Sequence, residues 1–421
     1  MIINCITETI GNTPLLTIDP AVHNIPNVTL YAKLELLNPF GSLKDRIAAN
    51  ILDPDKAQGK IVIESSSGNT AKALASICGK NKLTFQIVTN RIREPEVRDI
   101  LKIMGTDIEE LPGYSECPDP NDPKNPVTYI ENKMAEHPEK YFHTNQYFNE
   151  KNPEAHEQTG DEIAQDTHID YFFSILGTHG SSKGISKILK QRYNTKTLGI
   201  VTEASHSVPG GRTELEIFEV GLYDKTVYED ILIGDTTEAI DGMLTLIRKQ
   251  GIPCGPTTGL TFSKIKEYFQ KNPVSEQTTV VFLACDRIEN HISYIKKHRP
   301  GIFAANKKEE EQGENLSLEE VTEAPEIESH DLKETDMIID IRSNLAYNRS
   351  HIPQSLNIPG DMFEDLVQNN IFDAKQRIVL VCPRGTITKR FAALLVKRGY
   401  DAYSLKEGFL GWLKKKTKGA S

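Results

Sequence analysis

The sequence predicts an α/β protein with largely parallel sheets, and its pattern of apolar residues is the main reason. Short apolar runs typical of buried strands alternate with segments whose apolar residues recur every three or four positions, as in helices. Such alternation indicates parallel strands joined by helices that cover both faces of each sheet. The composition agrees, because 38% hydrophobic and 26% charged residues in a chain of 421 are ordinary for two or three globular domains.

The expected strands of the first 300 residues are short and apolar. They cover residues 28–36, 60–65, 83–89, 171–176, 198–204 and 279–285. Two of the segments between them, residues 70–80 and 94–105, carry apolar residues at helical spacing. Strands and helices that follow one another in this order predict a parallel sheet with crossover helices.

The composition changes after Pro300, and this change predicts a second domain. Residues 301–328 are acidic and poor in aromatic side chains, which is typical of an exposed linker. Strand-like runs and then an amphipathic helix follow. The sequence therefore predicts a first domain at residues 1–300, a linker at 301–328 and a small α/β domain at 329–421.

Charge and cysteine usage exclude several classes of function. A formal net charge of -10 argues against nucleic acid as the main partner, because a phosphate backbone requires a basic surface. No apolar run approaches the roughly 20 residues that span a bilayer. The six cysteines have neither paired spacing nor zinc-ligand spacing, which fits a reducing cytoplasm. We therefore expect a cytoplasmic protein that acts on small molecules.

Three glycine-containing loops follow predicted strands, and ligands bind beyond the carboxyl ends of strands in open α/β sheets. The loops are residues 38–46 (NPFGSLKDR), 65–70 (SSSGNT) and 177–184 (GTHGSSKG). A glycine- and hydroxyl-rich turn that opens a helix offers free backbone N–H groups and the positive end of the helix dipole to a phosphate. The three loops in this order, with Lys44 isolated in the first, are far more specific than any one of them.

These loops resemble those of the pyridoxal phosphate (PLP) enzymes of fold type II, in particular the cysteine synthase and cystathionine β-synthase family. Residues 11–16 (GNTPLL), 145–163 and 251–259 extend the resemblance, which spans residues 1 to about 300. It implies a two-subdomain fold like that of the tryptophan synthase β-subunit. It also implies PLP as the cofactor and, because members of the family are commonly homodimers, a homodimer.

The resemblance also implies roles for individual residues. Lys44 would bind PLP as a Schiff base, and its released amine would take the α-proton of the substrate. Asn69 would donate a hydrogen bond to the ring hydroxyl of the cofactor. The phosphate would be held by Gly177, Thr178, His179, Gly180 and Ser181. The substrate carboxylate would be held by Ser66, Ser67, Thr70 and Gln146.

Some positions depart from the pattern of the family and leave alternatives open. His179 replaces a small residue, and its side chain either contacts the phosphate or points outward. The family usually places a serine against the pyridine nitrogen, where this chain offers Cys285, Asp286 or Arg287. Of these, Asp286 would keep the ring protonated and strengthen its electron-withdrawing effect. Arg212 either binds the phosphate of O-phosphoserine with two hydrogen bonds or is a surface arginine.

Cys382 stands directly after a predicted strand and before a helix in the second domain. Successive backbone N–H groups in such a loop stabilise a thiolate. Residues 336–359 and 382–412 resemble a rhodanese domain, which implies that Cys382 accepts a sulfane sulfur as a persulfide and passes it on. Ile387 occupies the position near the end of the loop where an arginine is usual. This departure leaves open a module without turnover.

Together the two sites predict a β-replacement on O-acetyl- or O-phospho-L-serine with a sulfur nucleophile. The product would be L-cysteine or an S-substituted analogue, and the rhodanese domain would handle the sulfur. Two other reactions remain open for the first site: formation of 2,3-diaminopropionate with an amino donor, and β-elimination of cysteine. For the second site, a docking or sensing module remains open. The sequence leaves the leaving group and the sulfur donor undetermined.

Overall fold

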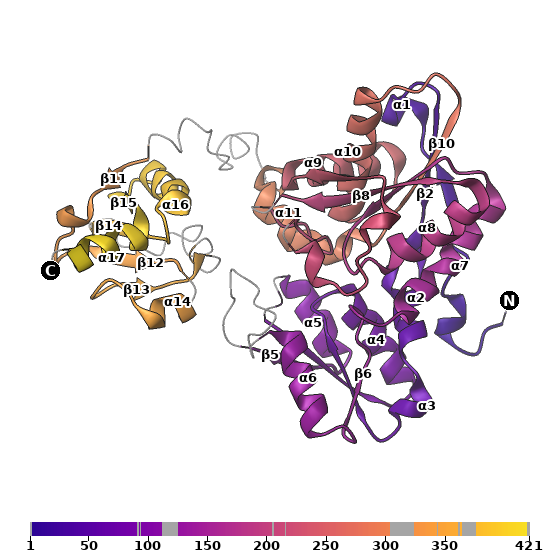
Figure 1. Cartoon of the computed structure of the whole chain (residues 1–421), viewed down its shortest axis with the longest axis horizontal. Helices are drawn as coiled ribbons and strands as arrows, with labels where there is room; N and C mark the ends of the chain where they lie inside the picture. The colour runs from indigo at the N-terminus through magenta and orange to yellow at the C-terminus, as the bar shows by residue number, and fades with distance from the viewer. Residues whose placement is uncertain are drawn as a thin grey trace. The chain divides into compact units, whose positions relative to one another are not determined.

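The computed structural model divides the chain into two compact units, which are described separately (Figure 1). It describes residues 2–90, 92, 94–111, 125–203, 206–214, 216–303, 324–342, 344–360, 363 and 376–418. Within these residues, the first unit extends to Phe303 and the second begins at Ala324. The predicted linker at 301–328 therefore lies largely outside the described residues.

The first unit contains a six-stranded sheet with the order β1-β2-β10-β7-β8-β9. Only β1 is antiparallel to its neighbour; all other pairs are parallel. Its strands are β1 (Leu15–Thr17), β2 (Val28–Lys33), β7 (Tyr171–Ile175), β8 (Lys196–Thr202), β9 (Asp230–Gly234) and β10 (Thr278–Leu283). The accompanying helices are α1 (Pro20–His23), α7 (Lys151–Asp166), α8 (Gly180–Tyr193), α9 (Thr236–Gln250), α10 (Pro256–Lys271) and α11 (Ile292–His298). Helices α7 and α8 pack together, as do α9 and α10, and both α8 and α10 contact β7.

A second, four-stranded parallel sheet in the same unit has the order β5-β4-β3-β6. Its strands are β3 (Ile61–Ser65), β4 (Thr84–Thr89), β5 (Asp107–Glu110) and β6 (Tyr141–His143). The helices of this part are α2 (Lys44–Ile51), α3 (Pro54–Ala57), α4 (Asn69–Lys80), α5 (Pro95–Ile103) and α6 (Pro126–Glu136). One hydrophobic core includes side chains from both parts, for example Leu74 of α4 and Phe172 of β7. The two-subdomain α/β fold predicted from the sequence is confirmed.

All six strands predicted for this unit are present, with ends shifted by up to three residues. Both predicted helices are present as α4 and α5. Helices α2, α4, α8 and α10 each begin directly after a loop, and three of these loops are the glycine-containing segments identified in the sequence. The parallel topology therefore brings these helix N-termini to the carboxyl edges of the two sheets.

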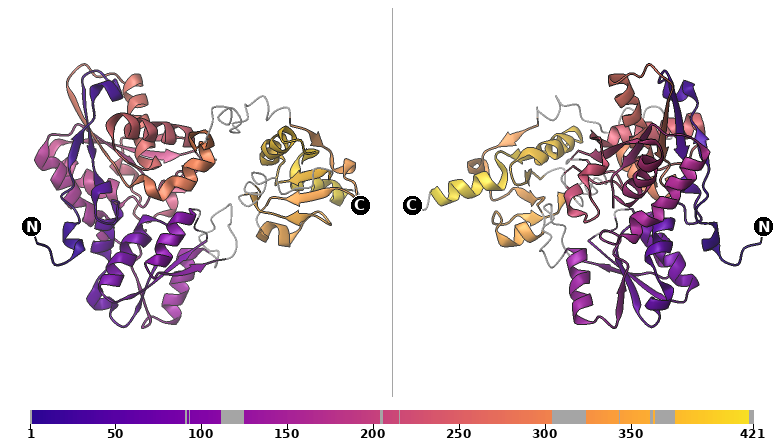
Figure 2. Two further views of the ribbon diagram at one scale, coloured as in Figure 1. Left: turned by 180° about the vertical axis from the view of Figure 1, so that it is seen from behind. Right: turned by 45° about the vertical axis from the view of Figure 1, so that its right-hand side comes forward.

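The second unit, coloured orange to yellow in Figure 2, is a small α/β domain. Its five-stranded parallel sheet has the order β11-β15-β14-β12-β13. Its strands are β11 (Glu326–Ile327), β12 (Met337–Asp340), β13 (Leu356–Asn357), β14 (Ile378–Val381) and β15 (Ala402–Leu405). Its described helices are α14 (Asn344–Arg349), α16 (Thr386–Lys397) and α17 (Gly408–Lys418). Successive residues of β14 enter different apolar clusters, Ile378 and Leu380 one and Val379 and Val381 the other. Both faces of this sheet are therefore covered, as expected for parallel strands.

Short 3-10 helices complete the described secondary structure. They are η1 (Ile6–Thr9), η2 (Glu35–Leu37), η3 (Ile217–Glu219), η4 (Lys225–Val227), η5 (Ile288–His291), η6 (Pro300–Phe303) and η7 (Ser329–Asp331). In the part of the chain that the structure describes, none of the helices has the length and apolar character needed to cross a membrane.

Candidate active site

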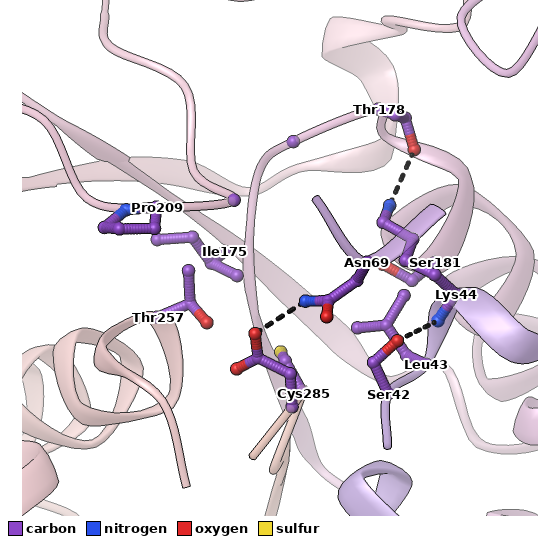
Figure 3. Close-up of a pocket in the computed structure, with 13 residues that line it drawn as sticks. Ser42, Leu43, Lys44, Asn69, Ile175, Thr178, Ser181, Pro209, Thr257 and Cys285 are labelled. Atoms are coloured by element: carbon purple, nitrogen blue, oxygen red, sulfur yellow. Dashed lines mark hydrogen bonds between the residues drawn. The ribbon is translucent and has the colours of Figure 1, made fainter. Parts of the chain in front are cut away.

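A cavity in the first unit lies at the carboxyl ends of parallel strands, where the three glycine-containing loops meet (Figure 3). Of the residues predicted for the site, those that line it are Lys44, Asn69, Gly177, Thr178, Ser181, Cys285 and Asp286. The predicted residues outside its described lining are Ser66, Ser67, Thr70, Gln146, His179, Gly180 and Arg212. The structure thus brings together residues from four separate stretches of the chain.

Lys44 is the first residue of α2, and its part-buried side chain points into the cavity (Figure 3). Its Nζ atom donates a hydrogen bond to Oγ1 of Thr178 at 3.3 Å. Burial lowers the pKa of the Lys44 amine to about 8, although the nearby Cys285 and Asp286 act in the opposite direction. More of the amine is therefore uncharged near neutral pH than for an ordinary lysine, and the uncharged amine is the state that attacks a carbonyl carbon.

Two neighbours of Lys44 fix the loop that carries it. The carboxylate of Asp45 accepts hydrogen bonds from the backbone N–H of Phe40 at 2.6 Å and from Oγ of Ser42 at 3.4 Å. Arg46 is buried and forms ion pairs of 2.7 Å with both Glu35 and Glu162. Buried ion pairs with several hydrogen bonds hold their partners in one geometry. The backbone on either side of Lys44 is therefore anchored.

The N-terminus of α8 presents backbone N–H groups to the cavity, which Gly177, Thr178 and Ser181 line. A Cβ atom on Gly177 would lie 2.6 Å from the backbone oxygen of Gly210, and one on Gly180 would lie 1.8 Å from Oδ1 of Asn152. Both positions therefore require glycine. The free N–H groups and the helix dipole make this turn suitable for an anion such as a phosphate.

The side chain of His179 is turned toward two tyrosines. Its ring packs edge-on against Tyr223 with centroids 4.9 Å apart, and Nδ1 lies 3.2 Å from the hydroxyl oxygen of Tyr228. Burial, with the nearby positive charges of Arg212 and Lys44, lowers the pKa of His179 to about 4. The imidazole is therefore neutral near pH 7. The ring of His179 is therefore buried and does not point outward, and the residue is not among those that line the cavity.

The residues predicted to hold the substrate carboxylate gather beside Asn69, at the end of β3. Oγ1 of Thr70 donates to Oε1 of Gln146 at 2.7 Å. Beneath them lies the buried carboxylate of Glu64, which accepts from the backbone N–H of Gln146 at 3.1 Å and from Oγ1 of Thr144 at 2.6 Å. Burial raises the pKa of Glu64 to about 7, although these hydrogen bonds act to lower it.

Two serines of the same loop differ in their contacts. Oγ of Ser66 accepts a hydrogen bond from the backbone N–H of Ala71 at 3.2 Å, which fixes the turn before α4. Ser67 is part-buried in this turn. The arrangement places hydroxyl groups at the N-terminus of α4, where a carboxylate is stabilised by the helix dipole.

Arg212 packs over the ring of Tyr147, with its guanidinium carbon 5.3 Å from the ring centroid. Its backbone N–H donates to the oxygen of Leu176 at 2.8 Å, next to Gly177. Arg212 also comes shortly after Pro209 and Gly210 in the sequence, and both of these residues line the cavity. This cation–π contact with Tyr147, which belongs to the segment 145–163, holds the positive charge near the site.

At the end of β10, two of the three residues that the sequence left open line the cavity. Cys285 and Asp286 line the cavity, whereas Nε of Arg287 donates to the backbone oxygen of Leu36 at 2.9 Å. Burial raises the pKa of the Cys285 thiol to about 12, with Asp286 adding to the effect. Cys285 is therefore a neutral thiol, and Asp286 is the acidic group at this end of the cavity.

Sequence reasoning missed the polar residues that surround Asn69 and Asp286. Nε2 of His291 lies 2.8 Å from Oδ2 of Asp286, and Asn290 donates to Oδ1 of Asn69 at 2.9 Å. Lys72 in turn donates to Oδ1 of Asn290 at 3.0 Å. The one available signal was that Asn290 and His291 follow β10, a strand that ends at the site; Lys72, within α4, gave no such signal.

In the second unit, Cys382 lies between β14 and α16, as predicted, and is 1% exposed. Its Sγ atom accepts a hydrogen bond from the backbone N–H of Gly385 at 3.1 Å and lies 3.4 Å from Oγ1 of Thr388. Ile387, at the position where the sequence lacks the usual arginine, is 51% exposed. One backbone N–H of the loop before α16 is thus directed at the sulfur atom.

Comparisons with known proteins match two different families to two parts of the chain. A family model described as a pyridoxal-phosphate dependent enzyme matches residues 6–286, and one described as a rhodanese-like domain matches residues 323–415. A cysteine synthase of Staphylococcus aureus is 31% identical over 271 residues, which cover 60% of this chain and 84% of the relative.

Two further proteins are similar over the same part of the chain. An N-(2-amino-2-carboxyethyl)-L-glutamate synthase of Cupriavidus metallidurans is 30% identical over 321 residues, covering 70% of this chain and 90% of its own. The crystal structure of a hydrogen sulfide-producing enzyme from Fusobacterium nucleatum superposes with a TM-score of 0.60 and 29% identity, covering 69% of this chain and 99% of its own. Since the first family model covers more than half of the sequence, the chain belongs to the pyridoxal-phosphate dependent enzymes, with a cysteine synthase-like domain followed by a rhodanese-like domain.

Proposed function

We propose that the first unit catalyses a β-replacement on O-acetyl- or O-phospho-L-serine with a sulfur nucleophile. The Cβ–O bond breaks, acetate or phosphate leaves, and a C–S bond forms, which gives L-cysteine or an S-substituted analogue. The observation that carries the proposal is the Lys44 amine, which lies beside the glycine-rich start of α8 with a lowered pKa. Similarity to a cysteine synthase supports sulfur as the nucleophile. Similarity to a hydrogen sulfide-producing enzyme supports the alternative reaction, β-elimination of cysteine.

The cavity residues fit PLP by their chemistry. Lys44 offers an amine that is partly uncharged near neutral pH for the aldehyde group. Gly177 and Gly180, where a Cβ atom would clash with Gly210 and Asn152, let the turn before α8 pack closely against these residues. The helix N-terminus at this turn suits a phosphate. Oδ1 of Asp286 is buried and has no hydrogen-bond partner among the described residues, so an acceptor is available for a polar ring atom. Bound PLP supplies an electron sink for the carbanion that forms at the substrate Cα.

The protein groups then have distinct tasks. The Lys44 amine takes the proton from Cα, because it is the basic group that points into the cavity. Thr70 and Gln146, with the serines before α4, bind the substrate carboxylate. Glu64 holds the backbone of Gln146 in place from beneath. Arg212 binds the anionic leaving group when the substrate is O-phosphoserine.

An amino donor is the second candidate nucleophile, and the similarity to the synthase of Cupriavidus metallidurans favours it. To distinguish the nucleophiles, purified protein with PLP receives O-acetylserine or O-phosphoserine together with one nucleophile. Sulfide, thiosulfate and L-glutamate are each added in a separate reaction. Products are identified by mass spectrometry. A sulfur-containing amino acid supports the proposal. Formation of only the glutamate adduct, or release of sulfide from L-cysteine faster than any synthesis, would overturn it.

For the second unit, we propose that the Cys382 thiolate takes the outer sulfur of a sulfane donor such as thiosulfate, which leaves as sulfite, and so becomes a persulfide. Two thiols of a reductant then release this sulfur as sulfide for the first site and become a disulfide, and the Cys382 thiolate is regenerated. The support for this proposal is the hydrogen bond from the Gly385 N–H to Sγ. We also propose, from the family resemblance, that the enzyme is a homodimer in the cytoplasm. Sedimentation of the purified enzyme tests whether it is a homodimer. A mass equal to that of one chain would contradict the proposal.

A further inference from the structure

Asp286 and His291 form a buried acid–imidazole pair at the end of the cavity. Oδ2 of Asp286 lies 2.8 Å from Nε2 of His291 and accepts a second hydrogen bond from Nδ2 of Asn69 at 2.6 Å. Figure 3 shows the latter bond as a dashed line from Asn69. Both members of the pair are 4% exposed. Oδ1 of Asp286 has no hydrogen-bond partner among the described residues, although Asp286 lines the cavity.

The surroundings of the pair favour its charged form. Burial alone lowers the pKa of His291, but the charge of Asp286 and its hydrogen bond, together with Glu94 and Glu96, outweigh burial and raise it. The imidazole is thus stabilised as a cation that donates to Asp286. The negative charge of a carboxylate that shares a hydrogen bond with an imidazole stabilises the cationic imidazole.

The fold also makes room for this pair at Gly255, the residue before α10. A Cβ atom there would lie 2.2 Å from Oδ1 of Asp286 and 2.7 Å from Nε2 of His291. The backbone N–H of Gly255 donates to the backbone oxygen of Asp286 at 3.0 Å. A glycine at this position therefore lets the carboxylate and the imidazole pack directly under the start of α10.

We propose that Asp286 binds the pyridine nitrogen of PLP and, with His291 as its positioning residue, keeps that nitrogen protonated. The inference rests on the proposed function, which places the aldehyde of PLP at Lys44 and its phosphate at the start of α8. The pyridine nitrogen lies on the side of the ring opposite these two groups. On that side, Cys285 is a neutral thiol and Arg287 is bonded to a backbone oxygen, which leaves the free oxygen of Asp286.

The proposal distinguishes this chain from relatives with a serine at the same place. A neutral hydroxyl does not stabilise a positive ring nitrogen, whereas a carboxylate does, so the proton stays on the nitrogen. A protonated ring withdraws electrons more strongly from the substrate Cα, which makes the proton that Lys44 removes more acidic. The charged groups that act on Asp286 or His291 are Lys44, Lys72, Glu94 and Glu96.

The test is ¹⁵N NMR of the holoenzyme reconstituted with PLP labelled at the ring nitrogen. Near neutral pH, the signal is expected in the pyridinium range for the parent chain. Asp286→Asn and Asp286→Ser are expected to move it to the neutral pyridine range. His291→Asn, which removes a neighbouring positive charge but leaves Asp286, is expected to raise the pH at which the ring loses its proton. His168→Asn is the matched control, because His168 forms an exposed pair with Asp170 at 3.0 Å elsewhere in the unit. A neutral ring in the parent, or a pyridinium signal unchanged in Asp286→Asn, overturns the proposal.

A second measurement uses the unmodified chain and therefore does not depend on how the variants fold. The parent is expected to bind PLP about ten- to a hundredfold more tightly than 1-deaza-PLP, which has carbon in place of the ring nitrogen, as a charge-assisted hydrogen bond predicts. Equal affinities overturn the inference. A chain that binds PLP with a neutral ring refutes the inference alone, whereas a chain that binds no PLP refutes the proposed function as well.

Discussion

The Nζ atom of Lys44 lies 3.3 Å from Oγ1 of Thr178, although 134 positions separate the two residues in the sequence. This contact joins the loop before α2 to the loop before α8, and so places an amine beside a turn suited to phosphate. A cofactor with an aldehyde and a phosphate arm requires these two groups at one site. The predictions that follow test the contributions of the amine, the turn, the supporting carboxylate and the second site.

Lys44→Ala is expected to reduce the rate of β-replacement by about a thousandfold or more, because the variant lacks the general base and the group that binds the aldehyde. The rate is measured with saturating substrate and added PLP. Lys187→Ala, which removes an exposed amine paired with Glu157, is the control and should match the parent. A Lys44→Ala rate within tenfold of the parent would exclude Lys44 from the chemistry.

The lowered pKa of Lys44 predicts how PLP binding depends on pH. Only the uncharged amine attacks the aldehyde, so the rate of covalent binding to the protein without PLP should rise with pH and reach half its maximum near pH 8. An ordinary lysine would reach this point more than two pH units higher. Stopped-flow absorbance across a pH series measures the midpoint, and a value above pH 10 would contradict the burial argument.

Gly180→Ala is expected to weaken PLP binding at least tenfold, since its Cβ atom would lie 1.8 Å from Oδ1 of Asn152 and displace the turn that faces the phosphate. Gly79→Ala is the matched control, because no atom lies within 4 Å of its added Cβ. That change, near the end of α4, should raise the free energy of unfolding by about 0.5–1 kcal/mol. PLP titration and urea unfolding of both variants provide the comparison, and equal PLP affinities would disprove a close phosphate approach.

Glu64 should make stability depend on pH in a defined direction. Its pKa is raised in the folded protein to about 7, so the folded state binds more protons than the unfolded state between about pH 4.5 and pH 7. The contribution of Glu64 to stability therefore falls as pH rises through this window. Relative to the parent, Glu64→Gln should gain up to about 3 kcal/mol between pH 5 and pH 8. Urea unfolding at both values measures the gain, and a constant difference would mean that Glu64 titrates normally.

Cys382→Ser is expected to abolish transfer of sulfur from thiosulfate to cyanide by the full-length enzyme. The serine hydroxyl cannot form a persulfide, although it can occupy the same place beside Gly385 and Thr388. Cys5→Ser, which changes a part-buried thiol of the first unit, should leave the rate at the parent value. Thiocyanate formation is the measured quantity, and equal rates for Cys382→Ser and the parent would remove the sulfur-carrier role.

Features that depend only on residues adjacent in the sequence could be predicted. A buried strand, a turn of glycine and hydroxyl residues and a helix follow one another locally, so the positions of Lys44, Asn69 and Cys382 could be predicted. The strands β5 and β6 escaped prediction because DIEE and YFH are short and lack a continuous apolar run. They form strands because β4 and β3 offer them unpaired edges.

Features that depend on distant contacts could not be predicted. The bond between Asn69 and Asp286 spans 217 positions, and it appears only once two sheets place their carboxyl ends together. The orientation of His179 depends on Tyr228, which is 49 positions away. The sequence left the choice among Cys285, Asp286 and Arg287 open for the same reason, since a shift of one residue at the end of a strand changes which side chain faces the site.

The central claim is tested most directly by reduction of the PLP-treated protein with borohydride, followed by peptide mass spectrometry. Before reduction, the protein should show an absorbance band near about 410 nm, which is a property of the bound cofactor. After reduction, the mass of the reduced cofactor should appear on the peptide that contains Lys44. A protein that remains colourless with excess PLP, or a label confined to another lysine, would contradict the account.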